Sequence, residues 1–236
     1  MANLQKGVLE KVRHFLAKKN FTYEVIVVDD GSKDGSIEFL EKFCKENKSF
    51  SLVKNAHSGK AGAVTTGVLS AVGEYILFTD MDQATPIEEI DNLLPFFKDG
   101  YDIVIGSRSG ERKGSPWTRI IMARGMMLLR TGLIGLSGIT DTQCGFKMFR
   151  RNVAQELFTK ISRLHNGFSQ ISGSNVAAGF DVELLFLAQK MGYKIKEVPV
   201  HWLYVETRRV NPVRDSIEGF FDLLRIKQNS LQGKYK

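Results

Sequence analysis

The chain has 236 residues, of which 43% are hydrophobic and 25% charged, so it has the size and composition of one folded α/β domain rather than of a disordered chain. The net charge of +7 indicates an anionic partner, and a nucleic acid, a phosphorylated metabolite and an anionic membrane surface all fit it. The two cysteines, Cys44 and Cys144, lack the spacing of a disulfide framework or a zinc site and favour a reducing, cytosolic setting.

The first half of the chain alternates helices with strands. Apolar residues at helical spacing predict an amphipathic helix over 4–18. Short β-branched runs predict strands at 23–29, 50–54, 75–79 and 103–106, with helices at 36–46, 58–71 and 87–97. This order predicts a largely parallel sheet with helices on both faces, in which ligands bind at the carboxyl ends of the strands.

In the second half we expect an apolar helix after Trp117, a glycine-containing loop at 140–145, a helix near 181–190, a strand near 195–200 and a basic C-terminal helix. No run of about 18 apolar residues occurs, so no membrane span is expected. The stretch 117–136 fits a buried core helix or an interfacial helix whose methionines and leucines meet acyl chains while its arginines meet phosphate, and we favour the second. Nothing divides the chain, so a single domain over 1–236 is expected.

Two carboxylates follow the predicted strand at 75–79, at alternate positions. Asp80 and Asp82 offer the hard oxygen ligands that suit Mg²⁺ or Mn²⁺, which complete their shell with substrate phosphates. The alternative is that both aspartates form a turn or cap the next helix. Their place directly after a buried strand favours the metal site.

Two further groups follow predicted strands. Asp29 and Asp30 either form a plain turn or bind a nucleoside by accepting hydrogen bonds from its base or ribose. Lys60, between Gly59 and Gly62 at a helix start, either faces a phosphate or is a solvated lysine. The glycines do not have the P-loop order, which argues against a kinase or NTPase.

The order of motifs along the chain resembles that of family 2 glycosyltransferases. These motifs are VVDDGS (27–32), the Lys60 loop, FTDMD (78–82), GSR (106–108), DTQCGFKMF (141–149), FDVELLFLAQ (180–189) and EVPVHW (197–202). The resemblance runs from about residue 23 to the C-terminus and is strongest to the dolichyl-phosphate glucosyltransferase branch, through DTQCGFK followed by FDVELL.

The resemblance implies an A-type glycosyltransferase fold, which is Rossmann-like, with a largely parallel sheet flanked by helices. It also implies inverting transfer of a hexose, glucose from UDP-glucose, to a polyprenyl or dolichyl phosphate, with Mg²⁺ or Mn²⁺ as cofactor. The enzyme would be peripheral on the cytoplasmic face of a membrane, with a nucleotide-sugar-binding half at 23–110 and an acceptor-binding half with interfacial helices at 111–236. No nucleic-acid partner is expected.

The same resemblance assigns roles to individual residues. The donor would be bound by Asp29, Asp30, Ser32, Lys60, Asp80 and Arg209, the metal by Asp80 and Asp82, and the acceptor phosphate by Arg108, Arg119, Arg124 and Gln143. Arg208-Arg209 stands where the family usually has Ser-Lys. Because a phosphate monoester is largely ionised near neutral pH, the acceptor needs no strong base. Arg108 and Asp141 are then the catalytic candidates, Arg108 by aligning the acceptor oxygen and Asp141 as an assisting carboxylate, with a structural role in its loop as the alternative for Asp141.

The chain departs from the family's pattern in two places. Relatives carry a strand with a Pro-x-Tyr-Asn-Glu-Glu-type motif ahead of the first helix, and this chain begins after it. Because that strand lies inside the sheet, its loss is expected to leave ladder partners unpaired on both sides. The second departure is the Ser/Gly/Asn-rich segment 162–178, expected to be a loop near the acceptor.

Three other functions stay open. A GDP-mannose donor would use the same acidic residues. A soluble polysaccharide acceptor would not require Arg119 or Arg124. A non-enzymatic nucleic-acid-binding protein would explain the net charge, but it would not explain two acidic pairs at strand ends.

Overall fold

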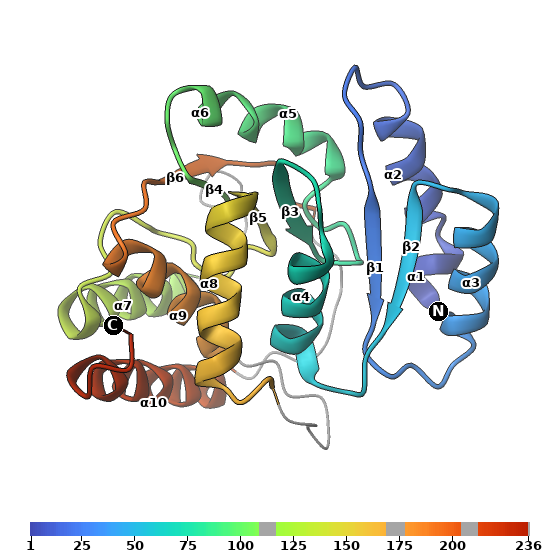
Figure 1. Cartoon of the computed structure of the whole chain (residues 1–236). Coiled ribbons are helices and arrows are strands. Elements are labelled where there is room, and N and C mark those ends of the chain that lie inside the picture. Colours follow the sequence, from blue (N-terminus) through green and yellow to red (C-terminus); the bar gives the residue numbers. More distant parts are fainter. Residues whose placement is uncertain (109–116, 169–177, 204–211, 236) are drawn as a thin grey trace.

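The structure is a computed structural model that describes residues 1–108, 117–168, 178–203 and 212–235 (Figure 1). Within these residues the strands are β1 (Val25–Asp29), β2 (Phe50–Lys54), β3 (Tyr75–Thr79), β4 (Ile103–Ser107), β5 (Phe146–Arg150) and β6 (Ile195–Pro199). The helices are α1 (Ala2–Gln5), α2 (Val8–Leu16), α3 (Ser36–Glu46), α4 (Gly59–Ser70), the 3₁₀ helix η1 (Ile87–Glu89), α5 (Ile90–Leu93), α6 (Pro95–Lys98), α7 (Trp117–Ile134), α8 (Arg151–Leu164), α9 (Ala178–Lys190) and α10 (Pro212–Leu231).

The strands form a mixed sheet in two parts. Strand β1 pairs with β2 in parallel, and the larger part has the order β3-β5-β4-β6. Strand β5 is antiparallel to both neighbours, whereas β4 and β6 are parallel. The α/β fold is therefore confirmed, but the antiparallel strand in its middle was not expected from the sequence. It lacks the alternation of a half-exposed strand because residues 146–149 are all buried.

The two parts of the sheet meet at β1 and β3 without a ladder between them. Among the described residues β1 pairs only with β2, and β3 only with β5. Instead, β1 and β2 share a separate apolar core with α1, α2 and α3, which includes Leu9, Leu40 and Phe50.

Side chains of β5 alternate between the two faces of the larger sheet. Phe146 and Met148 pack with Phe97 of α6 on one face. Phe149 lies on the other face, where its ring centroid is 5.7 Å from that of Phe158 of α8. Lys147 shares the alternation of Phe149 and so points toward the helices α4, α8 and α9, two of which stand in front of the sheet in Figure 1. Burial of each large apolar side chain stabilises the fold by about 1.5–3 kcal/mol.

Helix α10 is fixed to α9 at its end. The hydroxyl of Tyr235, which follows α10, donates a hydrogen bond to the buried carboxylate of Glu183 on α9. Glu183 also lies 2.6 Å from Nε2 of His165, which follows α8. Burial raises the pKa of Glu183, but hydrogen bonds from His165 and Tyr235 outweigh it and lower the pKa. One ionised carboxylate thus joins three segments of the chain.

The topology brings several loops to one edge of the sheet. Because β3 and β4 both run antiparallel to β5, they end where β5 begins, and Thr79 is in register with Phe146. Strand β6 ends at the same edge, with Pro199 in register with Ser107. Residues that directly follow β3, β4 and β6, and those that directly precede β5, therefore meet there.

Candidate functional site

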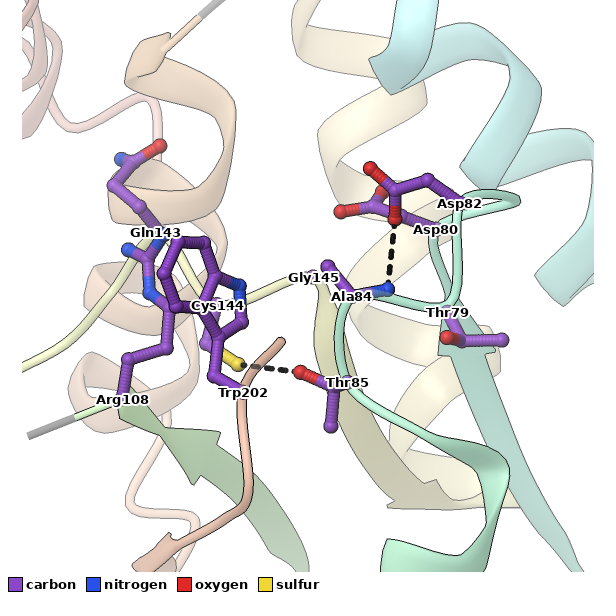
Figure 2. Close-up of a pocket in the computed structure, with 10 residues that line it drawn as sticks. All are labelled: Thr79, Asp80, Asp82, Ala84, Thr85, Arg108, Gln143, Cys144, Gly145 and Trp202. Carbon is purple, nitrogen blue, oxygen red and sulfur yellow. Dashed lines mark hydrogen bonds between the residues drawn. The ribbon is translucent and has the colours of Figure 1, made fainter. Parts of the chain in front are cut away.

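A pocket opens at this edge of the sheet. It is lined by Thr79, Asp80, Asp82, Ala84, Thr85, Arg108, Gln143, Cys144, Gly145 and Trp202. Figure 2 shows Asp80 and Asp82 together on one side, with Arg108, Gln143 and Trp202 on the other. The pocket therefore has an acidic wall from the β3 loop and a basic wall from the β4 loop.

Asp80 lies against the backbone of Gly145. Its amide donates a hydrogen bond of 3.2 Å to the Gly145 carbonyl. A Cβ atom at Gly145 would overlap the Asp80 carboxylate, of which even the more distant oxygen would be only 2.9 Å away. Only glycine leaves room for this carboxylate, so the DTQCGFK motif shapes the acidic wall directly.

The contacts of the acidic pair fit a cation site. The ammonium of Lys60 lies 3.0 Å from Oδ1 of Asp80, so a positive group already neutralises this carboxylate. Oδ1 of Asp82 accepts the Ala84 amide at 3.0 Å and so also stabilises the turn. No group of three or more His, Cys, Asp or Glu side chains suited to a metal occurs among the described residues. A divalent ion held by Asp80 and Asp82 would therefore need oxygens from water or phosphate, as Mg²⁺ and Mn²⁺ commonly have.

Asp30 positions the helix that carries Lys60. Its carboxylate accepts hydrogen bonds from the amides of Ser58 at 2.8 Å and Gly59 at 2.7 Å, at the start of α4. A carboxylate at this end also interacts favourably with the helix dipole. Nδ1 of His57, to which sequence reasoning gave no role, lies 2.9 Å from the same carboxylate.

Asp29 forms the turn at the end of β1. Its Oδ1 accepts the amides of Gly31 at 3.0 Å and Ser32 at 2.9 Å. Gly31 has a φ of 88°, which glycine adopts without strain. Oδ1 of Asp29 therefore stabilises this turn, and Ser32 is exposed beside it.

The basic wall is built by an ion pair with two parallel hydrogen bonds. Nε of Arg108 lies 2.7 Å from Oδ2 of Asp141, and Nη2 lies 2.8 Å from Oδ1. Burial raises the pKa of Asp141, but hydrogen bonds and charge from Arg108 outweigh it and lower the pKa to about 2. The guanidinium also lies 5.8 Å from the ring centroid of Trp202. Asp141 is thus ionised and engaged with Arg108.

Two residues that sequence reasoning did not single out hold the loop before β5. The carboxylate of Glu197 on β6 accepts the amides of Thr140 at 2.8 Å and Asp141 at 2.7 Å. The buried guanidinium of Arg130 donates to Oγ1 of Thr142 at 3.0 Å. The one feature of the sequence that could have pointed to Glu197 is its place in the EVPVHW motif.

The sequence model of the family described as "Glycosyl transferase family 2" matches residues 3–158. The chain belongs to this family. It is 32% identical to "Dolichyl-phosphate beta-glucosyltransferase" of Dictyostelium discoideum, over 98% of this chain and 72% of that protein. It is 36% identical to the protein of the same name from Homo sapiens, over 92% of this chain and 67% of that protein. The resemblance read from the motifs is confirmed.

Two solved structures share the fold of this family 2 chain. Mannosyl-3-phosphoglycerate synthase from Rubrobacter xylanophilus has a TM-score of 0.57 at 15% identity, over 96% of this chain and 69% of that one. Glucosyl-3-phosphoglycerate synthase from Mycobacterium tuberculosis, in complex with Mn²⁺, UDP and phosphoglyceric acid, has a TM-score of 0.53 at 19% identity, over 86% and 67%. The predicted A-type fold is confirmed, and family membership favours sugar transfer over the nucleic-acid-binding alternative.

The structure does not describe the side chains of the remaining candidates of the family 2 site. Arg209 falls in the segment 204–211, and the side chains of Arg119 and Arg124 on α7 are not among those described. Of the predicted site residues, the structure brings Asp80, Asp82, Arg108 and Gln143 around one pocket, with Lys60 bound to Asp80.

Proposed function

We propose that this family 2 enzyme transfers glucose from UDP-glucose, with inversion, to the phosphate of dolichol or a related polyprenol. The observation that carries the proposal is the pocket whose acidic wall, Asp80 and Asp82, faces the guanidinium of Arg108. Such a pocket can hold two anionic reactants side by side, one through a cation and one through an arginine. The names of the relatives support dolichyl phosphate as acceptor and glucose as the transferred sugar.

On the donor side, Asp80 and Asp82 would hold Mg²⁺ or Mn²⁺. The bound ion would supply neutralisation of the charge that develops on the leaving nucleoside diphosphate. Lys60, 3.0 Å from Asp80, would bind a donor phosphate oxygen. Asp29, Asp30 and Ser32 would contact the nucleoside, with Arg209 over the diphosphate, so that residues 23–110 make up the donor half.

On the acceptor side, Arg108 would bind the lipid phosphate together with Gln143, Arg119 and Arg124 from the half at 111–236. The acceptor oxygen is already ionised near neutral pH, since the second pKa of a phosphate monoester is about 6. The main task of this side is therefore orientation for in-line attack on the anomeric carbon. The two hydrogen bonds from Arg108 to Asp141 support a positioning role for Asp141 rather than proton transfer.

We further propose that helices α7 and α10 rest on the cytoplasmic face of a membrane. Apolar side chains recur along one side of α10 at Ile217, Phe220, Phe221, Leu224 and Leu231, and all are exposed. The opposite side buries Leu223 and Ile226 against the domain. A helix of a soluble domain usually has a polar outer side, so this stripe fits an apolar partner.

The surroundings of the stripe favour a lipid surface. Helix α7 packs beside α10 and adds exposed Leu128 and Leu129, while Arg225 and Lys227 provide positive charge near the stripe. Basic residues beside an apolar stripe are typical of helices that lie in an anionic membrane interface. Within the described part of the chain, no helix combines the length and apolarity that crossing a bilayer requires. Cys44 and Cys144, both free, fit the reducing cytoplasmic side.

A transfer assay tests the catalytic proposal. The protein is incubated with Mn²⁺, polyprenyl phosphate in detergent, and radiolabelled UDP-glucose, GDP-mannose or UDP-galactose, and label is counted in the lipid phase. We expect transfer from UDP-glucose to polyprenyl phosphate, none to the unphosphorylated polyprenol, and none in chelator. If label enters the lipid from GDP-mannose alone, the GDP-mannose alternative replaces this proposal. If label enters only a soluble polysaccharide, the alternative with a soluble acceptor replaces it.

Flotation with vesicles tests the membrane surface. We expect Phe221→Asp to reduce binding to vesicles that contain anionic lipid by about tenfold, since a charge replaces an exposed apolar ring that would insert into the membrane interface. Val72→Asp is the matched control, because Val72 is an exposed apolar residue between α4 and β3, far from the stripe in sequence. Equal losses for both variants, or none for either, would contradict the assignment.

A further inference from the structure

A tryptophan lines the pocket without being part of an apolar core. Trp202 follows β6, is half-buried, and belongs to none of the three apolar cores formed by the described residues. It is the one large aromatic side chain among the described residues that line the pocket. Ligand pockets are commonly lined by aromatic side chains beside a few polar groups that fix the orientation of the ligand. Core packing therefore does not explain this residue, whereas contact with a ligand would.

The indole lies beside the guanidinium of Arg108. The guanidinium carbon is 5.8 Å from the centroid of the Trp202 ring. Asp141 binds Nε and Nη2 of the same guanidinium. Arginine has five N–H groups, so an anion in the pocket can bind the N–H groups on Nη1 and Nη2 that Asp141 does not use. A phosphate held there lies next to the indole.

The backbone on both sides of Trp202 is tied to the two walls of the pocket. The Val200 amide donates a hydrogen bond of 3.0 Å to the carbonyl of Ser107 on β4, and the Leu203 amide donates one of 2.7 Å to the carbonyl of Ala84. The Leu203 side chain is 57% exposed. A second apolar side chain therefore follows the indole directly, at the surface of the protein.

We propose that Trp202 binds the first carbons of the acceptor's alkyl chain while Arg108 binds its phosphate. In a phosphate monoester the ester oxygen joins the phosphate directly to the first carbon, so a phosphate at Arg108 brings this carbon within reach of the indole. Figure 2 shows the indole on the side of the pocket opposite Asp80 and Asp82, which favours the acceptor over the donor as its partner.

Trp202 is then a specificity-determining residue that distinguishes an alkyl phosphate from inorganic phosphate. Inorganic phosphate has the charge that Arg108 binds, but it has no apolar group to cover the indole. The inference deepens the proposed function and rests on it, because it takes the acceptor phosphate to lie at Arg108.

Binding of two phosphates tests the proposal without sugar transfer. The 236-residue chain is titrated by calorimetry with citronellyl phosphate, a short water-soluble isoprenyl monoester, and with inorganic phosphate. In Trp202→Ala the Kd for citronellyl phosphate should rise about tenfold, since apolar contact area is lost, and the Kd for inorganic phosphate by less than about threefold. Trp202→Phe retains an aromatic face and should raise the first Kd by no more than about threefold.

Arg108→Lys is the matched comparison. It keeps the positive charge but loses the two-pronged hydrogen bonding of arginine, so it should weaken both phosphates by the same factor. A purely structural role of Trp202, exerted through the position of Arg108, predicts this same pattern for Trp202→Ala and would overturn the proposal. Equal Kd values of the wild-type protein for the two phosphates would also overturn it. So would a Trp202→Ala protein that loses affinity for UDP-glucose but not for UDP in Mn²⁺, because the indole would then contact the donor sugar.

Fluorescence tests the same contact with the indole in place. The chain has two tryptophans, so Trp117→Phe leaves Trp202 as the source of tryptophan emission. An alkyl chain that covers the indole excludes water from it, so citronellyl phosphate should shift the emission to shorter wavelength and inorganic phosphate should not. Unshifted emission at saturating citronellyl phosphate would refute the contact.

The two proposals fail in different ways. Selective binding of citronellyl phosphate with the emission shift, but without label transfer in the separate assay, would refute the proposed function and leave the alkyl contact standing. Label transfer together with a wild-type Kd for citronellyl phosphate in Trp202→Ala would refute the alkyl contact alone.

Discussion

Gly145→Ala should change the shape of the acidic wall while leaving the stability of the fold nearly unchanged. The added methyl group would overlap the Asp80 carboxylate, and its distance to the farther oxygen would be only 2.9 Å. Ordinary contacts lie near 3.5 Å, so the carboxylate must move by roughly an ångström or more. It can do so because the Asp80 side chain is 45% exposed, and Gly145 does not have the positive φ that would strain alanine.

We therefore expect a small change in stability and a large change in function. The free energy of unfolding should change by no more than about 1 kcal/mol. A misplacement of about 1 Å can lower catalysis about a hundredfold, and we expect transfer to fall by that factor. Urea denaturation measures the first quantity, and Mn²⁺-UDP binding with label transfer measures the second.

Gly132→Ala is the matched control for the stability and Mn²⁺-UDP measurements. Gly132 lies on an exposed part of α7, and an added methyl group there would contact nothing within 4 Å. It should retain wild-type Mn²⁺-UDP affinity. A folded Gly145→Ala protein with the same affinity and turnover as wild type would refute the reasoning about Asp80.

Three further results are expected. Asp82→Asn keeps an oxygen for the Ala84 amide but loses the charge, so the fold should persist while Mn²⁺ affinity, followed by spin resonance, falls at least about tenfold. Asp141→Asn should cost roughly 2 kcal/mol at pH 7, since Arg108 lowers the pKa of Asp141 from 3.8 to about 2. Because the folded-state pKa is the lower one, this difference is present in full above about pH 4 and shrinks toward pH 2, which denaturation across that range would show. Tyr235→Phe should lower stability by about 1–2 kcal/mol in thermal unfolding and leave Mn²⁺-UDP affinity unchanged, since neither Tyr235 nor Glu183 is among the residues that line the pocket.

Much of the fold could be predicted because its signals are local. The strands at 50–54 and 75–79 were predicted with the bounds that the structure has, since short β-branched runs between polar turns leave little choice. Strand β5 was missed because it is buried on both faces and so lacks the alternation of a half-exposed strand. The ion pair of the buried Lys147 in its centre is made with Asp181, which lies 34 residues later, so no local pattern could reveal it.

In the candidate site, too, some residues could be placed from the sequence and others could not. Asp80, Asp82 and Arg108 follow strands directly, so topology alone gathers them at one edge. The contacts of Asp30 with α4 and of Glu197 with the loop before β5 join segments that are distant in sequence. Their geometry depends on packing, so only their place in motifs could be read from the sequence.

Because β5 runs antiparallel to β3 and β4, the short stretch 141–145 that precedes it lies between the acidic wall and Arg108. At one end of this stretch Gly145 abuts Asp80, and at the other Asp141 grips Arg108. The four peptide bonds between Asp141 and Gly145 therefore help to set the distance between the carboxylates of the acidic wall and the guanidinium of Arg108. Changes of length in this stretch would misalign the two reactants even if every charged side chain were retained.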